Sequence, residues 1–203
     1  MTLIFDEASL VKSLSRLDAR EKHAFAAACA TRQLLCFETF STAFNAADAE
    51  RMRMYVGLLW EAIGEESFLE DYWQHALEQV MDLSPEENVP WTPLHAYAED
   101  AIASLSYSIR CLVSNSAQEA AWAARRAYEA ADQAAIHAIE ITPGPDSEAR
   151  ILAHKIVQRE LERQERDVRL LQAGGGGAIK TIQSRAYEEQ LLDESELQIP
   201  DQR

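Results

Sequence analysis

Basic residues are scarce in this sequence: 19 Lys and Arg stand against 34 Asp and Glu, for a formal net charge of −15. Nucleic acids and anionic membranes are bound by clustered positive charge. Arg51, Arg53, Arg125 and Arg126 are too few for a basic stripe, and the arginines of residues 147–173 are interleaved with acids. The balance excludes nucleic acid and membrane as partners and favours a basic protein, although acidity also serves solubility alone.

Cysteine is rare as well, with only Cys29, Cys36 and Cys111. An odd and sparse set is typical of reduced thiols in a reducing cytoplasm. Cys29 and Cys36 lie seven residues apart, which on one helix places them about 10 Å from each other, too far for a disulfide. We therefore predict three buried structural thiols and a cytoplasmic protein.

Long apolar runs are missing too. No uninterrupted apolar stretch reaches the roughly 20 residues that a membrane-spanning helix needs. Residues 1–7 lack a basic segment followed by an apolar one, so they are not a secretory signal. With 203 residues, of which 47% are hydrophobic, the chain is long and apolar enough to bury one core of its own.

Helical periodicity fills most of the chain, and no strand is predicted. Three capping boxes open helices, at Asp18-Ala19-Arg20-Glu21, Ser67-Phe68-Leu69-Glu70 and Ser116-Ala117-Gln118-Glu119. Asp48 is placed to cap a helix that ends at Gly64, and Thr92-Pro93 to start another. Breaks are expected at residues 45–48, 84–92 and 142–146.

Two of the predicted helices have a distinctive composition. The helix after Ser116 is rich in alanine, so neighbouring helices can cross it closely, and we place it at the centre of the fold. The last long helix, residues 147–173, has an apolar seam formed by Val157, Leu161, Gln164, Val168 and Leu171. Its other faces are charged and include Arg159, Glu160, Glu162, Arg163, Glu165, Arg166, Asp167 and Arg169.

Four consecutive glycines, residues 174–177, follow this helix and are interpreted as a flexible hinge. The sequence therefore predicts an all-α domain over residues 1–173, the hinge at 174–177, and an acidic amphipathic tail over 178–203 at its periphery. The fold class is an antiparallel helical bundle of about seven helices with a C-terminal helical tail. The sequence leaves open whether the tail docks on its own domain or on another molecule.

Catalytic motifs are not found. There is no Gly-x-Ser-x-Gly elbow, and the glycine run lacks the preceding strand of a phosphate loop. The pairs His75/Glu78, His95/Glu99 and His137/Glu140 reverse the order of the Glu-x-x-His pairs in di-metal bundles, without partner carboxylates on the apolar stripes. We predict no catalytic residue, no metal and no cofactor, and keep a metal- or thiol-dependent enzyme as the third alternative.

Several segments, in this order and spacing, resemble a known family. They are Leu14–Leu17 (LSRL), His23–Arg32 (HAFAAACATR), Tyr55–Glu61 (YVGLLWE), the helix over residues 96–112, and Glu165–Leu171 (ERDVRLL). Together they are similar to the YjaG-like family of bacterial proteins, domain of unknown function 416, over about residues 10–173. The resemblance implies a compact all-α fold and carries no assigned reaction, so no site residue is transferred from it.

The leading hypothesis is a non-enzymatic, acidic protein-binding module, for example an immunity-type protein that neutralises a basic toxin or effector. The alternative is a homo-oligomeric housekeeping or structural protein, such as a homodimer paired through the last helix and the tail. Trp91, between two prolines, is the aromatic residue expected at the surface. The predicted partner contacts are Glu65, Glu66, Glu70, Asp71, Glu86, Glu87, Trp91, Glu188, Glu189, Asp193, Glu194 and Glu196.

Overall fold

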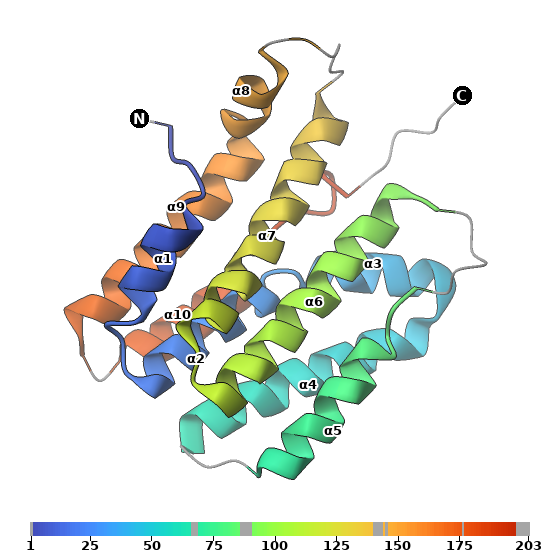
Figure 1. Ribbon diagram of the computed structural model, residues 1–203. Coiled ribbons are helices and arrows are strands. Elements are labelled where there is room, and N and C mark those ends of the chain that lie inside the picture. The colour runs from blue at the N-terminus through green and yellow to red at the C-terminus, as the bar shows by residue number, and fades with distance from the viewer. Residues whose placement is uncertain are drawn as a thin grey trace.

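The fold is all-α. The computed structural model describes residues 2–65, 69–85, 91–139, 144, 146–175 and 177–197, and within these the chain forms ten helices and no strand (Figure 1). The helices are α1 (Glu7–Leu14), α2 (Ala19–Thr31), α3 (Leu34–Phe44), α4 (Ala46–Glu65), α5 (Glu70–Met81), α6 (Pro93–Ser114), α7 (Ala117–Ala138), α8 (Ser147–Leu152), α9 (Lys155–Ala173) and α10 (Ala178–Glu188). The predicted fold class is confirmed.

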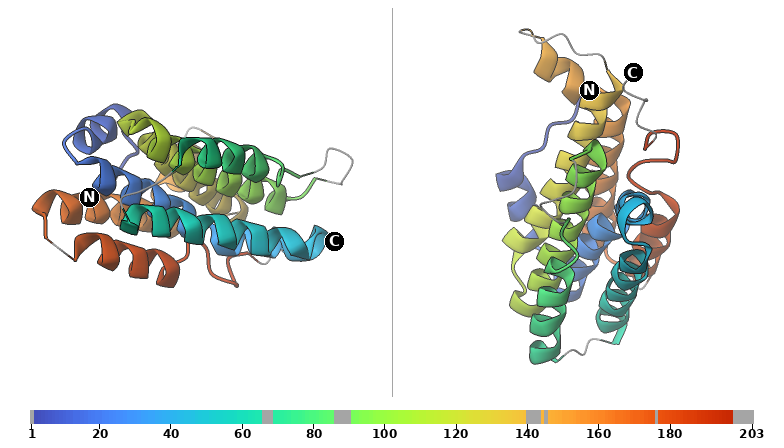
Figure 2. Two further views of the ribbon diagram at one scale, coloured as in Figure 1. Left: turned by 90° about the horizontal axis from the view of Figure 1, so that it is seen from below. Right: turned by 90° about the vertical axis from the view of Figure 1, so that its right-hand side faces the viewer.

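Helix α7 lies at the centre, as its alanine content predicts. It packs against α1, α2, α6, α8 and α9, most extensively against α6, to which two residues join it as an antiparallel pair. Ala123, Ala124, Ala127 and Ala130 are completely buried, so short side chains stand where the neighbours cross. Helix α5 packs outside α6, and α10 packs on α2 and α9 (Figures 1 and 2).

Two predicted helices are each divided, which accounts for the larger number of helices. The segment after Asp18 stops at Thr31 and resumes at Leu34, because Arg32 turns into the protein and its carbonyl oxygen accepts a hydrogen bond from the amide of Leu191 at 2.6 Å. The last helix divides into α8 and α9 at His154, whose ring accepts from the amide of Ile156.

Helix starts follow the predicted caps in most of the described chain. The capping box of Asp18 and Glu21 is present, and Ser116 accepts from the amide of Glu119. Pro93 opens α6 after Thr92. Ser67 lies outside the described residues, but α5 begins at Glu70 with Leu69 as its N-cap, so Glu70 is not the third helical residue that the predicted capping box requires. The prediction for Asp48 is wrong: α4 begins at Ala46, and Asp48 lies inside its first turn, where it accepts from Asn45.

The three cysteines are free and buried, as predicted. Cys29 belongs to α2 and Cys36 to α3, so the two do not share one helix as the spacing suggested. Burial raises the pKa of each thiol to about 12, which keeps it protonated at neutral pH. None of the helices in the described residues combines the length and apolarity needed to cross a membrane.

The tail differs from its predicted place at the periphery. Helix α9 ends at Ala173, and Gly174 and Gly175 after it have positive φ angles of 67° and 136°, which glycine tolerates best. Beyond the glycines, Ile182 of α10 belongs to the main core, and Leu191 and Leu192 are fully buried in a second one. The described part of the tail is therefore docked on its own chain.

Candidate functional surfaces

Negative charge is concentrated in one part of the chain. Residues 54–109 contain eleven Asp and Glu but no Lys or Arg. This segment forms most of α4, all of α5 and most of α6. The uneven distribution of charge is visible in the sequence. A search for motifs overlooks it, because the segment is defined by its lack of Lys and Arg.

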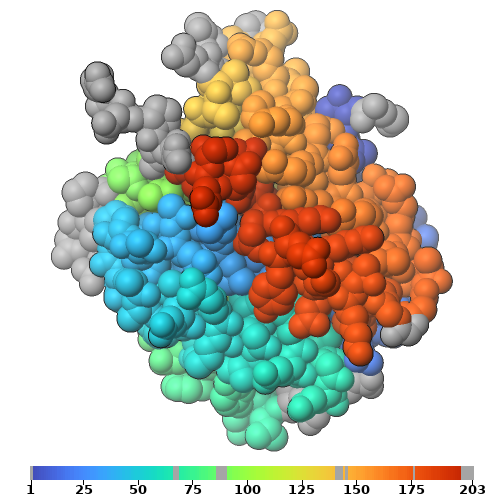
Figure 3. Space-filling view, turned by 180° about the vertical axis from the view of Figure 1, so that it is seen from behind, coloured from blue at the N-terminus to red at the C-terminus, as the bar shows by residue number. Residues whose placement is uncertain are grey.

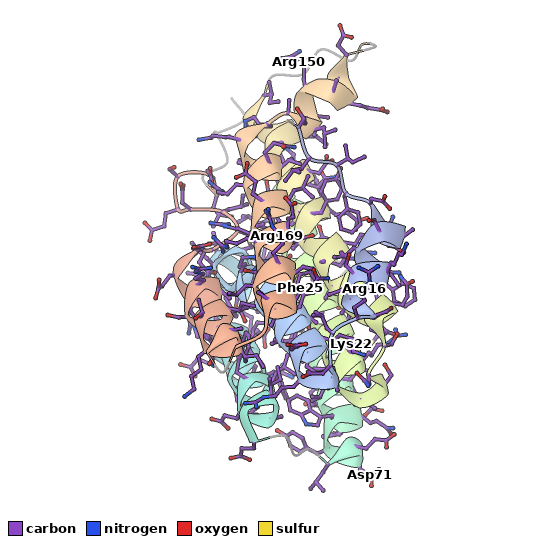
Figure 4. All side chains as sticks on the ribbon, turned by 90° about the vertical axis from the view of Figure 1, so that its left-hand side faces the viewer. Arg16, Lys22, Phe25, Asp71, Arg150 and Arg169 are labelled. Atoms are coloured by element: carbon purple, nitrogen blue, oxygen red, sulfur yellow. The ribbon has the colours of Figure 1, made fainter. Side chains whose placement is uncertain are left out.

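Helix α5 carries an acidic line on its outer side, which we call the α5 stripe. Asp71, Glu78 and Asp82 recur at i, i+7 and i+11, project to one side of the helix, and are exposed. By the same geometry Tyr72 and Met81, exposed by 45% and 58%, lie along its two borders. Figure 4 places Asp71 at the end of the molecule opposite Arg150. Exposed apolar side chains thus flank a line of acidic groups.

The predicted contacts near this stripe have the following positions. Glu65 ends α4 and is exposed, and Glu70 and Asp71 are exposed in the first turn of α5. Trp91 is exposed by 65%, as predicted. Glu66, Glu86 and Glu87 lie outside the described residues. Glu78 and Asp82 were not among the predicted partner contacts and belong to the same surface.

The predicted contacts in the tail divide into two groups. Within the chain, Glu189 forms an ion pair with Arg166, and Glu196 forms one with Arg159. Glu188 accepts from Ser184, and Asp193 accepts from Ser195 and from backbone amides of the same turn. Glu194 is exposed. Glu189 and Glu196 thus bind arginines of their own chain.

A buried charge cluster joins α2 to α9. Arg32 is 1% exposed and donates twice to Glu160, at 3.0 and 2.8 Å, and once to Asp167 at 2.9 Å. Gln164 donates to Glu160 and to the carbonyl oxygen of Ala124. Burial opposes the charge of Arg32, but the two carboxylates raise its pKa, so the guanidinium stays charged.

The prediction that Glu160 and Asp167 belong to the charged, solvated faces of the last helix is wrong. The two residues are 0% and 1% exposed. Both stand one position from the apolar seam, seven residues apart, and therefore face the same neighbour. Their burial follows from Arg32, which supplies the charge and the donors that two carboxylates inside a core require. No local pattern links residues 128 and 135 positions apart.

The predicted His and Glu pairs do not converge. His75 and Glu78 are exposed and 3.5 Å apart, whereas His95 is buried as a cap that accepts from the amide of Thr92. Glu140 lies outside the described residues. In the described part of the chain, no three His, Cys, Asp or Glu side chains are grouped as metal ligands would be.

An open groove of about 370 Å³ separates α1 from α9. Leu10, Leu161 and Val168 give it an apolar lining, with Glu165 and Arg169 also among the lining residues. Figure 4 shows Arg169 on α9, across from α1. The two helices lie apart here because each packs on α7.

A family model described as "Protein of unknown function (DUF416)" matches residues 9–191. This chain belongs to the DUF416 family. The matched range of this DUF416 protein runs through the glycines and α10 to Leu191, so the family's sequence includes this part of the tail. The resemblance found in the sequence is confirmed at the level of the family.

Among solved structures, a DUF416 family protein from Shewanella baltica OS155 is similar, with a TM-score of 0.73 and 18% sequence identity. The match covers 88% of this chain and 93% of that one. At this identity the likeness concerns the fold alone. No curated protein matches this DUF416 chain.

Proposed function

We propose that this protein is a non-enzymatic binding protein of the cytoplasm, and that its partner is a basic protein surface docking on the α5 stripe. The observation that carries the proposal is the run of 56 residues without Lys or Arg, which leaves the acids around α5 largely without counter-charges. An immunity-type protein that neutralises a basic toxin is one example of this class.

The chemistry of the stripe supports docking of a protein. Acidic side chains attract a basic partner over a distance set by ionic strength, and so speed the encounter. Tyr72 and Met81 supply apolar area at its borders, and exposed Leu69 adds more at the start of the helix. Aromatic and apolar side chains that become buried on docking are the usual source of affinity, and here they lie on both sides of the acidic line.

Two arginines lie near the ends of α4 and α5. Arg51 donates to the carbonyl oxygen of Gln79 at one end of the helix and forms an ion pair with Asp48. Arg20 donates to the carbonyl oxygens of Ile63 and Gly64 at the end of α4. Both guanidinium groups thus donate to backbone carbonyl oxygens near helix ends.

A matched pair of charge-reversal variants tests the proposal. Tagged full-length protein is used to capture partners from native lysate at low and at high salt, beside Asp71→Lys/Glu78→Lys. The control, Glu148→Lys/Glu162→Lys, makes the same change of charge at exposed acids of α8 and α9.

We expect the wild type and the control to retain the same basic protein at low salt, and the stripe variant to retain at least about tenfold less. Equal loss in both variants would show that net charge alone governs capture. Retention by all three proteins would place the interface elsewhere, and absence of any basic partner at low salt would contradict the proposed function.

A further inference from the structure

The described tail, residues 178–197, lies on a surface formed by α2, α9 and the start of α3, which we call the seat. Figure 3 shows the tail, in red and orange, spread over the outside of the molecule. Its apolar side chains point inward, and Ile182, Ala186, Leu191, Leu192 and Leu197 are between 0% and 5% exposed. The seat is therefore apolar where the tail covers it.

Charged contacts surround this apolar centre. Arg159 donates hydrogen bonds to Glu196 from both terminal nitrogens, at 3.1 and 2.6 Å. Arg166 donates to Glu189 in the same way, at 3.2 and 2.7 Å. Arg163 donates to the carbonyl oxygen of Gln190 at 3.0 Å. Two-pronged pairs of this kind fix orientation as well as charge. Three arginines of α9 thus bind the tail through its carboxylates and its backbone.

Backbone groups complete the recognition at the break between α2 and α3. The amide of Leu191 donates a hydrogen bond to the carbonyl oxygen of Arg32. The side chain of Gln190 accepts one from the amide of Leu35 at 3.0 Å. The same side chain donates to the carbonyl oxygen of Thr31 at 3.4 Å. The seat therefore recognises an acidic amphipathic segment by apolar, ionic and backbone contacts together.

The connection to the tail is made of glycines, and the fit is incomplete. Residues 174–177 carry no side chain that would restrict the path between α9 and α10. A cleft of about 410 Å³ remains beside the tail, lined by Leu35, Arg159, Arg163, Glu189 and Leu192 among others. The glycine link therefore does not fix the tail on the helices of its own chain.

We propose that the seat is an interaction surface for the tail of a second copy of this chain, so that two chains associate by exchanging residues 178–197. An emptied seat exposes apolar area and three arginines, and the second copy's tail is the one segment known to match both. Exchange rebuilds every contact described above between chains. In a single chain the short tether keeps the tail at millimolar effective concentration, so the closed monomer prevails when the protein is dilute.

Reversal of charge on one side of the contact at a time tests this inference in full-length protein. The tail variant is Glu189→Arg/Glu196→Arg, and the seat variant is Arg159→Glu/Arg166→Glu. Each variant sets like charges against each other within its own chain and releases its own tail. Mixed together, the Arg-bearing tail matches the Glu-bearing seat of the other chain, and the unaltered tail matches the unaltered seat. The control carries all four substitutions in one chain, which restores complementary charge within it.

Light scattering after size-exclusion chromatography gives the readout. We expect each variant alone and the four-substitution control to have the mass of one chain, and the mixture to have the mass of two. A mixture that stays monomeric while circular dichroism shows helical chains would overturn the proposal. Should a single variant lose its helical signal, recovery of that signal in a two-chain complex supports exchange, and no recovery beside a folded control refutes it. Neither result depends on the α5 stripe. A negative result here therefore leaves the proposed function untouched, and a negative result in the capture experiment leaves the exchange of tails untouched.

Discussion

Arg32 shows how one side chain can fix the course of a chain. Its guanidinium has left water completely, a cost that its two carboxylate partners offset through three hydrogen bonds. A buried ion pair contributes little net stability, whereas breaking one leaves an uncompensated charge inside the protein. Arg32 thus specifies the arrangement of α2 against α9 more than it strengthens it.

Arg32→Met should lower the free energy of unfolding by about 3–5 kcal/mol at neutral pH, because Glu160 and Asp167 then stay buried without a counter-charge. Urea denaturation measures the loss. Arg169→Met is the matched control, since Arg169 is 67% exposed and pairs only with Glu165 among the contacts described, and it should change stability by less than about 1 kcal/mol. An equal effect of both variants would show that the buried cluster has no special role.

Asp100 predicts a dependence of stability on pH. Burial raises its pKa from 3.8 to about 7, although Arg126 beside it lowers it. The folded chain therefore holds a proton on Asp100 that the unfolded chain has lost, so this contribution to stability is complete below pH 4 and lost as pH rises through about 7.

Asp100→Asn should remove this dependence, since the amide is neutral at every pH and Arg126 keeps its ion pair with Glu129. Relative to wild type, the variant should gain on the order of a few kcal/mol between pH 4 and 8. Urea denaturation at a series of pH values measures the difference. A constant difference between the two proteins across this range would contradict the assignment.

Among the elements, α7 depends on small side chains. Ala127 is completely buried, so Ala127→Leu forces three additional heavy atoms into a region without room and should cost about 1–3 kcal/mol, lowering Tm by several degrees. Ala138→Leu adds the same atoms at an exposed position of the same helix and should leave Tm within about one degree. A thermal melt followed by circular dichroism compares them. Equal melting temperatures would mean that α7 is not closely crossed.

The elements also show which parts of the fold a sequence can predict. Helix starts depend on residues three apart, so Asp18, Thr92 and Ser116 could be assigned from their neighbours alone. The division between α2 and α3 depends on contacts of Arg32 with α9 and with Leu191, more than 120 residues away. Local periodicity contains no information on such contacts, and it therefore predicted one continuous helix.

The candidate surfaces likewise combine what local sequence can predict with what only tertiary contacts decide. Glu70 and Trp91 could be predicted as exposed because acidic first turns and proline-flanked aromatics lie at surfaces. Glu189 and Glu196 have the same local character, yet each meets an arginine of α9 once the tail has docked. Acidity indicates that charge is present, and tertiary structure decides which charges remain available to a partner.

At the scale of the whole molecule, the net charge of −15 should make the protein sensitive to salt. Like charges repel within the folded state, and salt screens them over a Debye length of about 10 Å at 0.1 M and less above it. We expect Tm to rise by a few degrees between about 0.02 and 0.5 M NaCl. Asp71→Lys/Glu78→Lys should show a smaller rise. A fall of Tm with salt would mean that the internal ion pairs outweigh the repulsion.

The contact between the amide of Leu191 and the carbonyl oxygen of Arg32 also bears on the moment at which this chain can finish folding. A ribosome makes Arg32 well before Glu160, Asp167 and Leu191. Until Leu191 has emerged, the break between α2 and α3 lacks its backbone partner, and Arg32 lacks its carboxylates until α9 has emerged. The native core therefore closes only after residue 191 has left the ribosome, and until then the nascent chain relies on its local helices.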